Sequence, residues 1–261
     1  MTHYLRYFLM MVLFLSSQAQ AEVQTRTIEY QQGDAVLEGF LAFDSEGTPK
    51  KPGVLIVHEW TGLGTHAKNR AVQLAKLGYV AFAADIYGKG IRPANPKDAA
   101  ATAGIYKNNR SLMRERVKAA LTELRLQQGV DTTRIAAIGY CFGGTTVLEL
   151  ARSGADVKGI VSFHGGLDTP NLQEAKNIRA KVLVLHGADD PRVPPEQVKV
   201  FEDEMRNAEV DWQLVKYSKA VHSFTNPDAG NDNSRGAAYN AVADRRSWVE
   251  MNSFFKEIFQ P

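Results

Sequence analysis

The segment that most constrains how this chain folds is the run Gly-Tyr-Cys-Phe-Gly at residues 139–143, which contains the only cysteine, Cys141. An apolar stretch at 135–138 precedes it, and a helix-like stretch at 145–152 follows it. A strand, a glycine-flanked turn and a helix in this order predict a nucleophile elbow, in which a strained backbone presents the central side chain at the strand end. Cys141 is therefore the candidate nucleophile.

The two glycines of this segment support that interpretation. A side chain at Gly139 or Gly143 would collide with the neighbouring strand or helix in so sharp a turn. The helix that begins here presents free backbone N–H groups, which favour a thiolate or an oxyanion. A free cysteine is often a small buried hydrophobe, so a structural Cys141 is the alternative.

Hydrophobic periodicity predicts strands that alternate with helices along most of the chain. The first two strands alternate in polarity like an antiparallel pair, whereas later strands are apolar runs of the kind buried on both faces. We therefore expect an α/β fold with a mostly parallel, doubly wound sheet and an antiparallel N-terminal strand pair, and a loop at 88–97. The predicted strands cover residues 23–30, 35–43, 54–57, 79–84, 135–138, 159–163, 181–186 and 212–217, and the predicted helices cover 70–77, 114–127, 142–152, 195–207 and about 236–259.

Two later strand ends carry groups that a thiol nucleophile needs. Asp189 and Asp190 follow the strand at 181–186, and His222 follows the strand at 212–217. The chain order is nucleophile, acid, histidine, as in α/β-hydrolases. An imidazole takes the proton of a thiol, whose ordinary pKa is about 8.5, and a carboxylate fixes the tautomer of the imidazole. We expect Asp190 to be that carboxylate, with Asp189 as the alternative because spacing alone does not separate adjacent residues.

The loop after the strand at 54–57 begins with His58 and Glu59, and His66 follows nearby. These residue types suggest a metal site, but the metalloprotease spacing requires histidine at position 62, where the chain has glycine. We expect instead that the backbone N–H groups of Trp60 and Phe142 form an oxyanion hole. The remaining histidine at a strand end, His164, either lines the pocket or has a structural role.

At these positions the chain resembles the dienelactone hydrolase family of α/β-hydrolases, over about residues 53–259. The most specific motifs are Gly-Tyr-Cys-Phe-Gly-Gly at 139–144, His-Glu-Trp-Thr-Gly at 58–62, Asp-Ile-Tyr-Gly at 85–88 and His-Ser-Phe-Thr-Asn-Pro at 222–227. The resemblance implies a catalytic triad with no metal or organic cofactor, and a Glu59 carboxylate that interacts with the thiol and helps to convert it to the thiolate. It places the triad on Cys141, Asp190 and His222. The candidate residues of the substrate pocket are Tyr87, Lys89, His164 and Ser223.

The chain departs from this family where the family binds a substrate carboxylate with arginines. Lys89 stands near one such position, and Asn226 stands where the other arginine is expected. Neither a lysine nor an asparagine reproduces the two parallel bonds of an arginine fork. We therefore expect a weaker preference for anionic substrates, with Arg92 or Arg192 as candidates to restore the fork.

Residues 1–21 have the pattern of an export signal: Arg6, an apolar core at 7–15 and small residues that end at Ala21. We expect cleavage after Ala21, a single domain over 22–261 and a periplasmic location. The formal net charge of +2 gives no reason to expect nucleic acid partners, and no later apolar run suits stable membrane association. One cysteine forms no internal disulfide, and a monomer or a homodimer is expected.

Together these features predict an exported thiol hydrolase that cleaves a small-molecule ester or lactone through an acyl-thioester intermediate. A non-catalytic small-molecule binding protein on the same scaffold and a redox-sensing thiol protein are the alternatives.

Overall fold

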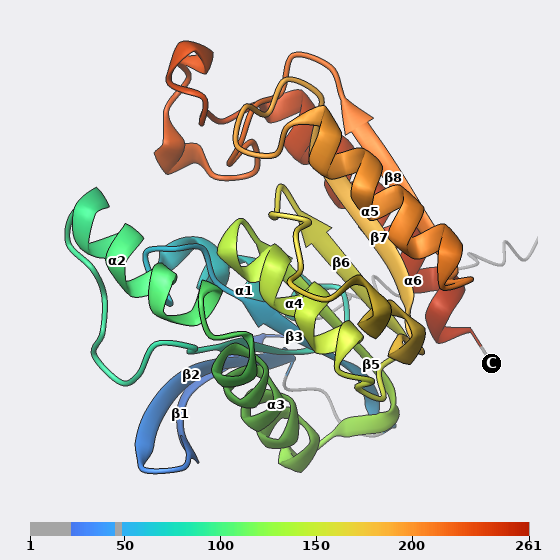
Figure 1. Cartoon of the computed structure of the whole chain (residues 1–261). Helices are drawn as coiled ribbons and strands as arrows, with labels where there is room; N and C mark the ends of the chain where they lie inside the picture. Colours follow the sequence, from blue (N-terminus) through green and yellow to red (C-terminus); the bar gives the residue numbers. More distant parts are fainter. Residues whose placement is uncertain (1–21, 45–48, 261) are drawn as a thin grey trace, which may run out of the picture.

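The structure, a computed structural model, describes residues 22–44 and 49–260, so the predicted export signal at 1–21 lies outside the described residues. Its centre is a sheet of eight strands in the order β1-β2-β4-β3-β5-β6-β7-β8 (Figure 1). The pairs β1–β2 and β2–β4 are antiparallel, and the other neighbours are parallel. The strands are β1 (Val23–Gln32), β2 (Ala35–Asp44), β3 (Lys51–Val57), β4 (Val80–Ala84), β5 (Val130–Tyr140), β6 (Gly159–Phe163), β7 (Lys181–Gly187) and β8 (Trp212–Tyr217).

Helices cover both faces of this sheet. Side chains of α1 (Thr65–Lys76) and α6 (Ala241–Phe259) pack into the apolar core on one face. Side chains of α3 (Arg110–Leu126), α4 (Phe142–Arg152) and α5 (Pro195–Asn207) pack into the core on the other face. The strands β3, β4, β6 and β7 and the second half of β5, residues 135–140, are mostly apolar and buried because both of their faces are covered. The α/β architecture predicted from the sequence is confirmed.

The largest difference from the prediction is α2 (Pro96–Lys107), which the sequence analysis did not identify. Its start has a clear local cause, since the Asn95 side chain accepts a hydrogen bond from the Asp98 N–H at 3.0 Å and Pro96 occupies the first turn. The helix is rich in alanine and only weakly amphipathic, so hydrophobic periodicity gave little signal.

The last helix also begins later than predicted. Two short 3₁₀ turns, Pro227–Ala229 and Asn233–Arg235, occupy the segment before it, and a third lies at Leu172–Asn177. The helix α6 begins at Ala241 because the Asn240 side chain accepts hydrogen bonds from the N–H groups of Val242 and Ala243. Within residues 22–44 and 49–260, no helix combines the length and the apolar character that crossing a membrane requires.

Candidate active site

Cys141 lies in the sharp turn between β5 and α4, with φ of 55° and ψ of −113°. A positive φ is costly for a residue with a side chain, so the surrounding contacts must hold it in place. The Cys141 N–H donates to the carbonyl of Phe163 on β6 at 3.0 Å, and its carbonyl accepts from the Gly144 N–H at 3.0 Å. These bonds fix the elbow at the carboxyl edge of the sheet.

The predicted reason for the two glycines of the elbow is confirmed. A Cβ atom on Gly139 would overlap the carbonyl oxygen of Gly143, and a Cβ atom on Gly143 would overlap the carbonyl oxygen of Val57. Both obstacles are backbone atoms, which have no rotamer to relieve the clash. Only glycine at both positions allows α4 to begin directly against the ends of β3 and β5.

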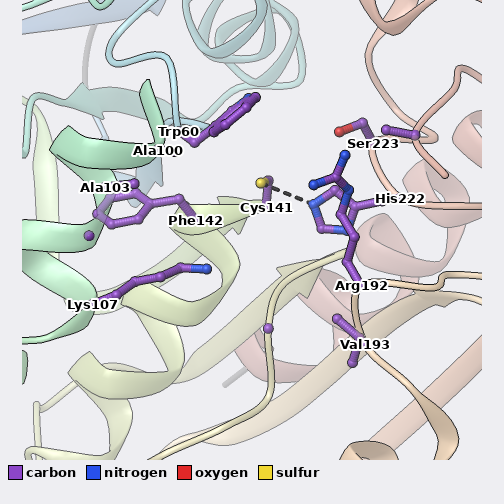
Figure 2. Close-up of a pocket in the computed structure, with 13 residues that line it drawn as sticks. Trp60, Ala100, Ala103, Lys107, Cys141, Phe142, Arg192, Val193, His222 and Ser223 are labelled. Carbon is purple, nitrogen blue, oxygen red and sulfur yellow. Dashed lines mark hydrogen bonds between the residues drawn. The ribbon is translucent and has the colours of Figure 1, made fainter. Parts of the chain in front are cut away.

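The three predicted triad residues lie in a line of hydrogen-bonding contacts. The Nε2 atom of His222 is 3.0 Å from the Sγ atom of Cys141 (Figure 2). Its Nδ1 atom is 2.8 Å from Oδ2 of Asp190. The other carboxylate oxygen of Asp190 accepts the Arg192 N–H at 2.8 Å. Asp190 is buried, whereas Asp189 is exposed. The contact with His222 is therefore made by Asp190 and not by its neighbour.

These contacts favour a charged imidazole. Burial of His222 favours its neutral form, but the Coulombic interaction with Cys141 and the hydrogen bonds with Asp190 and Cys141 outweigh it and raise the pKa of His222 to about 10. The Nδ1–H group donates to Asp190, which leaves Nε2 to share its proton with the sulfur. The geometry suits a thiolate–imidazolium pair.

The amides expected to bind an oxyanion lie beside the sulfur. In the parallel pairing of β3 with β5, Val57 is opposite Gly139, so the loop that carries Trp60 emerges next to the elbow. Phe142 is the first residue of α4, where a backbone N–H has no partner within its helix. Neither the Trp60 N–H nor the Phe142 N–H has a hydrogen-bond partner among the described residues. Both groups are available to an acceptor.

The thiol opens into a cavity of about 300 Å³, a size that suits a small molecule. Trp60 and Phe142 lie on one side of Cys141 in Figure 2, and His222, Ser223 and Arg192 lie on the other. Helix α2 lines one side of the cavity with the small residues Ala100, Ala103 and Gly104 and with Lys107 at its last position. The lining residues are Trp60, Ala100, Ala103, Gly104, Lys107, Cys141, Phe142, Gly166, Arg192, Val193, His222, Ser223 and Ala237.

Of the four residues predicted to line the pocket, Ser223 does so. Tyr87, Lys89 and His164 are described by the structure but are not among the residues that line the cavity. The Tyr87 hydroxyl donates to the Trp60 carbonyl at 2.9 Å and so supports the loop that carries Trp60. Lys89 is turned to the surface, where its ammonium pairs with Glu29. His164 is fully buried, and its ring packs against that of His222.

Glu59 is buried close enough to His222 to interact with its charge, but its direct contacts are with other residues. Its carboxylate accepts a hydrogen bond from the Asn226 amide at 2.5 Å and lies 3.6 Å from Nδ1 of His66. Burial raises the pKa of Glu59 to about 7, although the Asn226 bond opposes the shift. Burial and the charge of Arg70 lower the pKa of His66 to about 3, so its contact with Glu59 is not an ion pair near neutral pH. The thiol itself faces His222.

The histidine that suggested a metal site is held by the backbone. The Nδ1 atom of His58 lies 2.6 Å from the Glu59 carbonyl, and its Nε2 atom accepts the Ile86 N–H at 3.2 Å. Burial lowers the pKa of His58 to about 4, so the ring is neutral and connects the loops after β3 and β4.

The two arginines considered as replacements for the family's carboxylate ligands lie in different environments. The Arg92 guanidinium donates to the carbonyls of Leu63 and Ile91 and lies 3.6 Å from Asp85, so it holds a loop. Arg192 lines the cavity. Lys107 also lines it, and nothing in the sequence indicated this residue because α2 is too weakly amphipathic to be predicted from hydrophobic periodicity.

Comparison with known proteins agrees with this architecture. The sequence profile of the Dienelactone hydrolase family matches residues 37–259. A dienelactone hydrolase-like promiscuous phosphotriesterase from metagenomic libraries, known as a crystal structure, is 43% identical, with a TM-score of 0.87 over 91% of this chain and 99% of that chain. A Yersinia pestis protein named carboxymethylenebutenolidase is 27% identical over 87% of this chain and 85% of its own length. The Caenorhabditis elegans protein K02A2.1 is 35% identical over 56% of this chain and 94% of its own length.

Proposed function

Because the chain belongs to the dienelactone hydrolase family and is a carboxylic ester hydrolase, we propose that it cleaves small esters or lactones through a triad of Cys141, His222 and Asp190. The observation that carries this proposal is the line of contacts from sulfur to imidazole to carboxylate, 3.0 and 2.8 Å long. A nucleophile, a base and a group that orients the base meet within hydrogen-bonding reach, as covalent acyl transfer requires.

In the acylation step the Cys141 thiolate attacks the carbonyl carbon of the substrate. A carbon–sulfur bond forms, and the carbonyl electrons move onto the oxygen, which the N–H groups of Trp60 and Phe142 stabilise. When this intermediate collapses, the bond to the alcohol oxygen breaks and the leaving alkoxide takes the Nε2 proton of His222. The enzyme then holds an acyl-thioester and a neutral imidazole.

In the deacylation step neutral His222 accepts a proton from water, and the resulting hydroxide attacks the thioester. The carbon–sulfur bond breaks, the carboxylic acid leaves and the thiolate–imidazolium pair is restored. Asp190 keeps the Nδ1–H tautomer in place through both steps. Every proton is returned, so the cycle needs no cofactor.

The deciding experiment measures hydrolysis of p-nitrophenyl acetate by the purified protein, followed by acid quenching and mass spectrometry of the Cys141 peptide. We expect many turnovers and a transient acetyl group on Cys141. A binding protein would give no turnover. A redox-sensing thiol would also give none, but its sulfur would be oxidised by peroxide.

A phosphotriesterase side activity is the second candidate function. The observation that favours it is the 43% identity to a relative described as a promiscuous phosphotriesterase. The same thiolate would attack phosphorus with the phosphoryl oxygen at the amides of Trp60 and Phe142, so that a sulfur–phosphorus bond forms and the bond to the p-nitrophenolate oxygen breaks. Water activated by His222 would then cleave the sulfur–phosphorus bond, release the dialkyl phosphate and restore the thiolate. Hydrolysis of paraoxon, measured as the release of p-nitrophenol, tests this side activity. The activity should disappear together with esterase activity in Cys141→Ala, and paraoxon hydrolysis that persists in this variant would exclude the shared site.

We also propose that the protein is exported to the periplasm and that the mature chain begins at Glu22, as a single domain. The signal-like pattern of residues 1–21 supports this proposal. N-terminal sequencing of protein recovered from a periplasmic fraction tests it. A cytoplasmic protein that retains residues 1–21 would contradict it.

A further inference from the structure

The helix α2 forms one wall of the cavity that contains the thiol. The residues that line this wall are Ala100, Ala103, Gly104 and Lys107. Their spacing is that of a single face of a helix. The Gly104 carbonyl accepts the Asn108 N–H at 2.9 Å, so this glycine has the hydrogen bonding of an ordinary helical residue.

Neither the backbone nor the packing of the described residues requires glycine at position 104. The φ angle of Gly104 is not positive, and a Cβ atom there would have no described atom within 4 Å outside the backbone of its own helix. The other two glycines in helices of the described chain are different. A Cβ atom on Gly143 would overlap the Val57 carbonyl oxygen, and one on Gly144 would overlap the Ser162 hydroxyl. Of these three positions, only 104 has room for alanine.

Glycine at position 104 makes its helix less stable. A helix interior favours alanine over glycine, because glycine loses more backbone freedom when the chain folds. The open space beside Gly104 adjoins the cavity that this residue lines. The bare backbone therefore widens the cavity next to the thiol and weakens α2.

Aromatic contacts hold this part of α2 in place. The Tyr106 hydroxyl donates to the Tyr87 carbonyl at 3.0 Å, and the two rings stack with their centroids 5.2 Å apart. The Tyr106 ring also packs edge-on against the Phe142 ring, with 6.2 Å between the centroids. Because Phe142 follows Cys141 directly, these contacts tie the wall to the nucleophile. The space at Gly104 is a fixed feature of the site.

The geometry of acyl transfer determines which part of a substrate reaches this wall. The leaving oxygen must face Nε2 of His222 to take its proton, so the alcohol group lies on the His222 side of the sulfur. Trp60 and Phe142 lie on the opposite side of the sulfur (Figure 2). Ala100 and Ala103 of α2 lie on that side too. The acyl group, turned away from His222, therefore extends toward α2.

We propose that Gly104 determines the acyl specificity of the enzyme, because the space beside its backbone accepts a broad apolar acyl group such as a cyclohexyl or phenyl ring. Together with Ala100, Ala103 and Phe142 it forms an acyl subsite whose surface is apolar. This inference rests on the proposed hydrolase function and specifies the acyl part of its substrates.

The test compares two p-nitrophenyl esters with the same leaving group, the acetate and the cyclohexanecarboxylate. Each kcat/KM is divided by the rate constant for alkaline hydrolysis of the same ester, which removes the intrinsic difference in reactivity. We expect the normalised kcat/KM of the wild type to be at least about tenfold higher for the cyclohexanecarboxylate, a difference of about 1.4 kcal/mol in transition-state binding. A normalised value no higher than that of the acetate would overturn the acyl subsite.

Gly104→Ala and Gly104→Leu fill the space in two steps with good helix formers. The cyclohexanecarboxylate-to-acetate ratio should fall about threefold in Gly104→Ala and at least about tenfold in Gly104→Leu. Ala101→Leu enlarges an exposed residue of α2 that does not line the cavity, and it should leave the ratio unchanged. An equal fall in Ala101→Leu, or no fall in either Gly104 variant, would contradict the proposal.

A second pair of esters tests the orientation of the substrate. Phenyl acetate and 2-naphthyl acetate share the acyl group and differ in the alcohol, so their kcat/KM ratio should change by less than about twofold in Gly104→Leu. A fall confined to this pair would place the alcohol against α2 and overturn the assignment.

Thermal unfolding tests whether the fold needs this glycine. Gly104→Ala should raise Tm by about 1–4 °C, so that one substitution stabilises the protein and narrows its range of acyl groups. A lower Tm would show that the fold requires glycine at position 104 and would contradict the inference.

A binding experiment distinguishes failure of the acyl subsite from failure of the hydrolase proposal. Intact p-nitrophenyl cyclohexanecarboxylate is titrated into Cys141→Ala and into the double variant Cys141→Ala/Gly104→Leu. If the wild type hydrolyses no ester but the double variant binds at least about tenfold more weakly, the hydrolase is rejected and the acyl subsite is retained. Hydrolysis of both p-nitrophenyl esters with the same ratio in wild type and Gly104→Leu would retain the hydrolase and reject the acyl subsite.

Discussion

The ring of His164 packs edge-on against the ring of His222, with the two centroids 5.4 Å apart and the planes at 63°. His164 is fully buried, and its Nε2 atom lies 2.8 Å from the Thr225 hydroxyl. Burial, reinforced by the charge of His222, holds the pKa of His164 well below its usual range. A neutral ring at this position supports His222 without repelling its positive charge.

This contact predicts that Thr225, through His164, positions the ring of His222. Thr225→Val keeps the shape of the side chain but leaves a buried imidazole nitrogen without its partner, at a cost of about 1–3 kcal/mol. We expect kcat to fall by roughly tenfold with little change in KM, and the pH profile of kcat to shift, because His222 loses its support. Thr225→Ser retains the hydroxyl and should restore both. If Thr225→Val and Thr225→Ser lose kcat to the same extent and thermal stability to the same extent, Thr225 has a packing role only.

The thiol mechanism predicts that Cys141→Ala abolishes ester hydrolysis while the protein stays folded. The backbone of the elbow depends on Gly139 and Gly143 rather than on sulfur, so alanine fits the same turn. We expect kcat to fall by at least about a thousandfold and the circular dichroism spectrum to match wild type. Cys141→Ser is expected to be nearly as inactive because an alcohol is far less acidic than a thiol. Hydrolysis by Cys141→Ala at the wild-type rate would exclude Cys141 as the nucleophile.

The two adjacent acids provide a matched pair of variants. Asp190→Asn replaces the acceptor of the Nδ1–H group of His222 and should lower kcat by orders of magnitude, because the amide stabilises the wrong tautomer. Asp189→Asn changes an exposed side chain on the same loop and should lower kcat by less than about threefold. The check is steady-state kinetics on both proteins. A larger loss in Asp189→Asn would reverse the assignment.

Burial of Glu59 predicts a pH-dependent cost to stability. Its pKa in the folded protein is about 7, against an ordinary value of 4.5, so the folded state keeps this proton to a higher pH than the unfolded chain does. The stabilisation from this group is therefore complete below about pH 4.5 and is lost as the pH rises to about 7. Glu59→Gln imitates the protonated acid and should increase the free energy of unfolding by up to about 3 kcal/mol at pH 8, with little effect at pH 4.

Urea unfolding of wild type and Glu59→Gln across this pH range measures the difference directly. Asp34→Asn is the control, because it removes the same charge from an exposed side chain in the turn between β1 and β2. It should show no comparable pH dependence. A Glu59→Gln advantage that is equal at pH 4 and pH 8 would mean that the substitution acts through packing and not through charge.

The sequence by itself determined the elbow and most of the sheet, because each is encoded over a short range, and it gives the chain order Cys141, Asp190, His222 directly. A glycine-flanked cysteine between a strand and a helix specifies its own turn, and an apolar run such as that of β7 specifies a buried strand wherever it lies. Capping by Asn95 and Asn240 is also local, although weak periodicity hid the helix that Asn95 begins.

Only the tertiary structure decided which neighbouring or distant residues share the site. Asp189 and Asp190 have the same chemistry, and the packing of β7 beside β8 determines which of them meets His222. The same is true of charge: Lys89 turns outward to Glu29, while Lys107 and Arg192 reach the cavity from elements far apart in the chain. Periodic patterns report which face of an element is buried, but they carry no information about which elements bring their ends together, so contacts between distant segments appear only when the chain is folded.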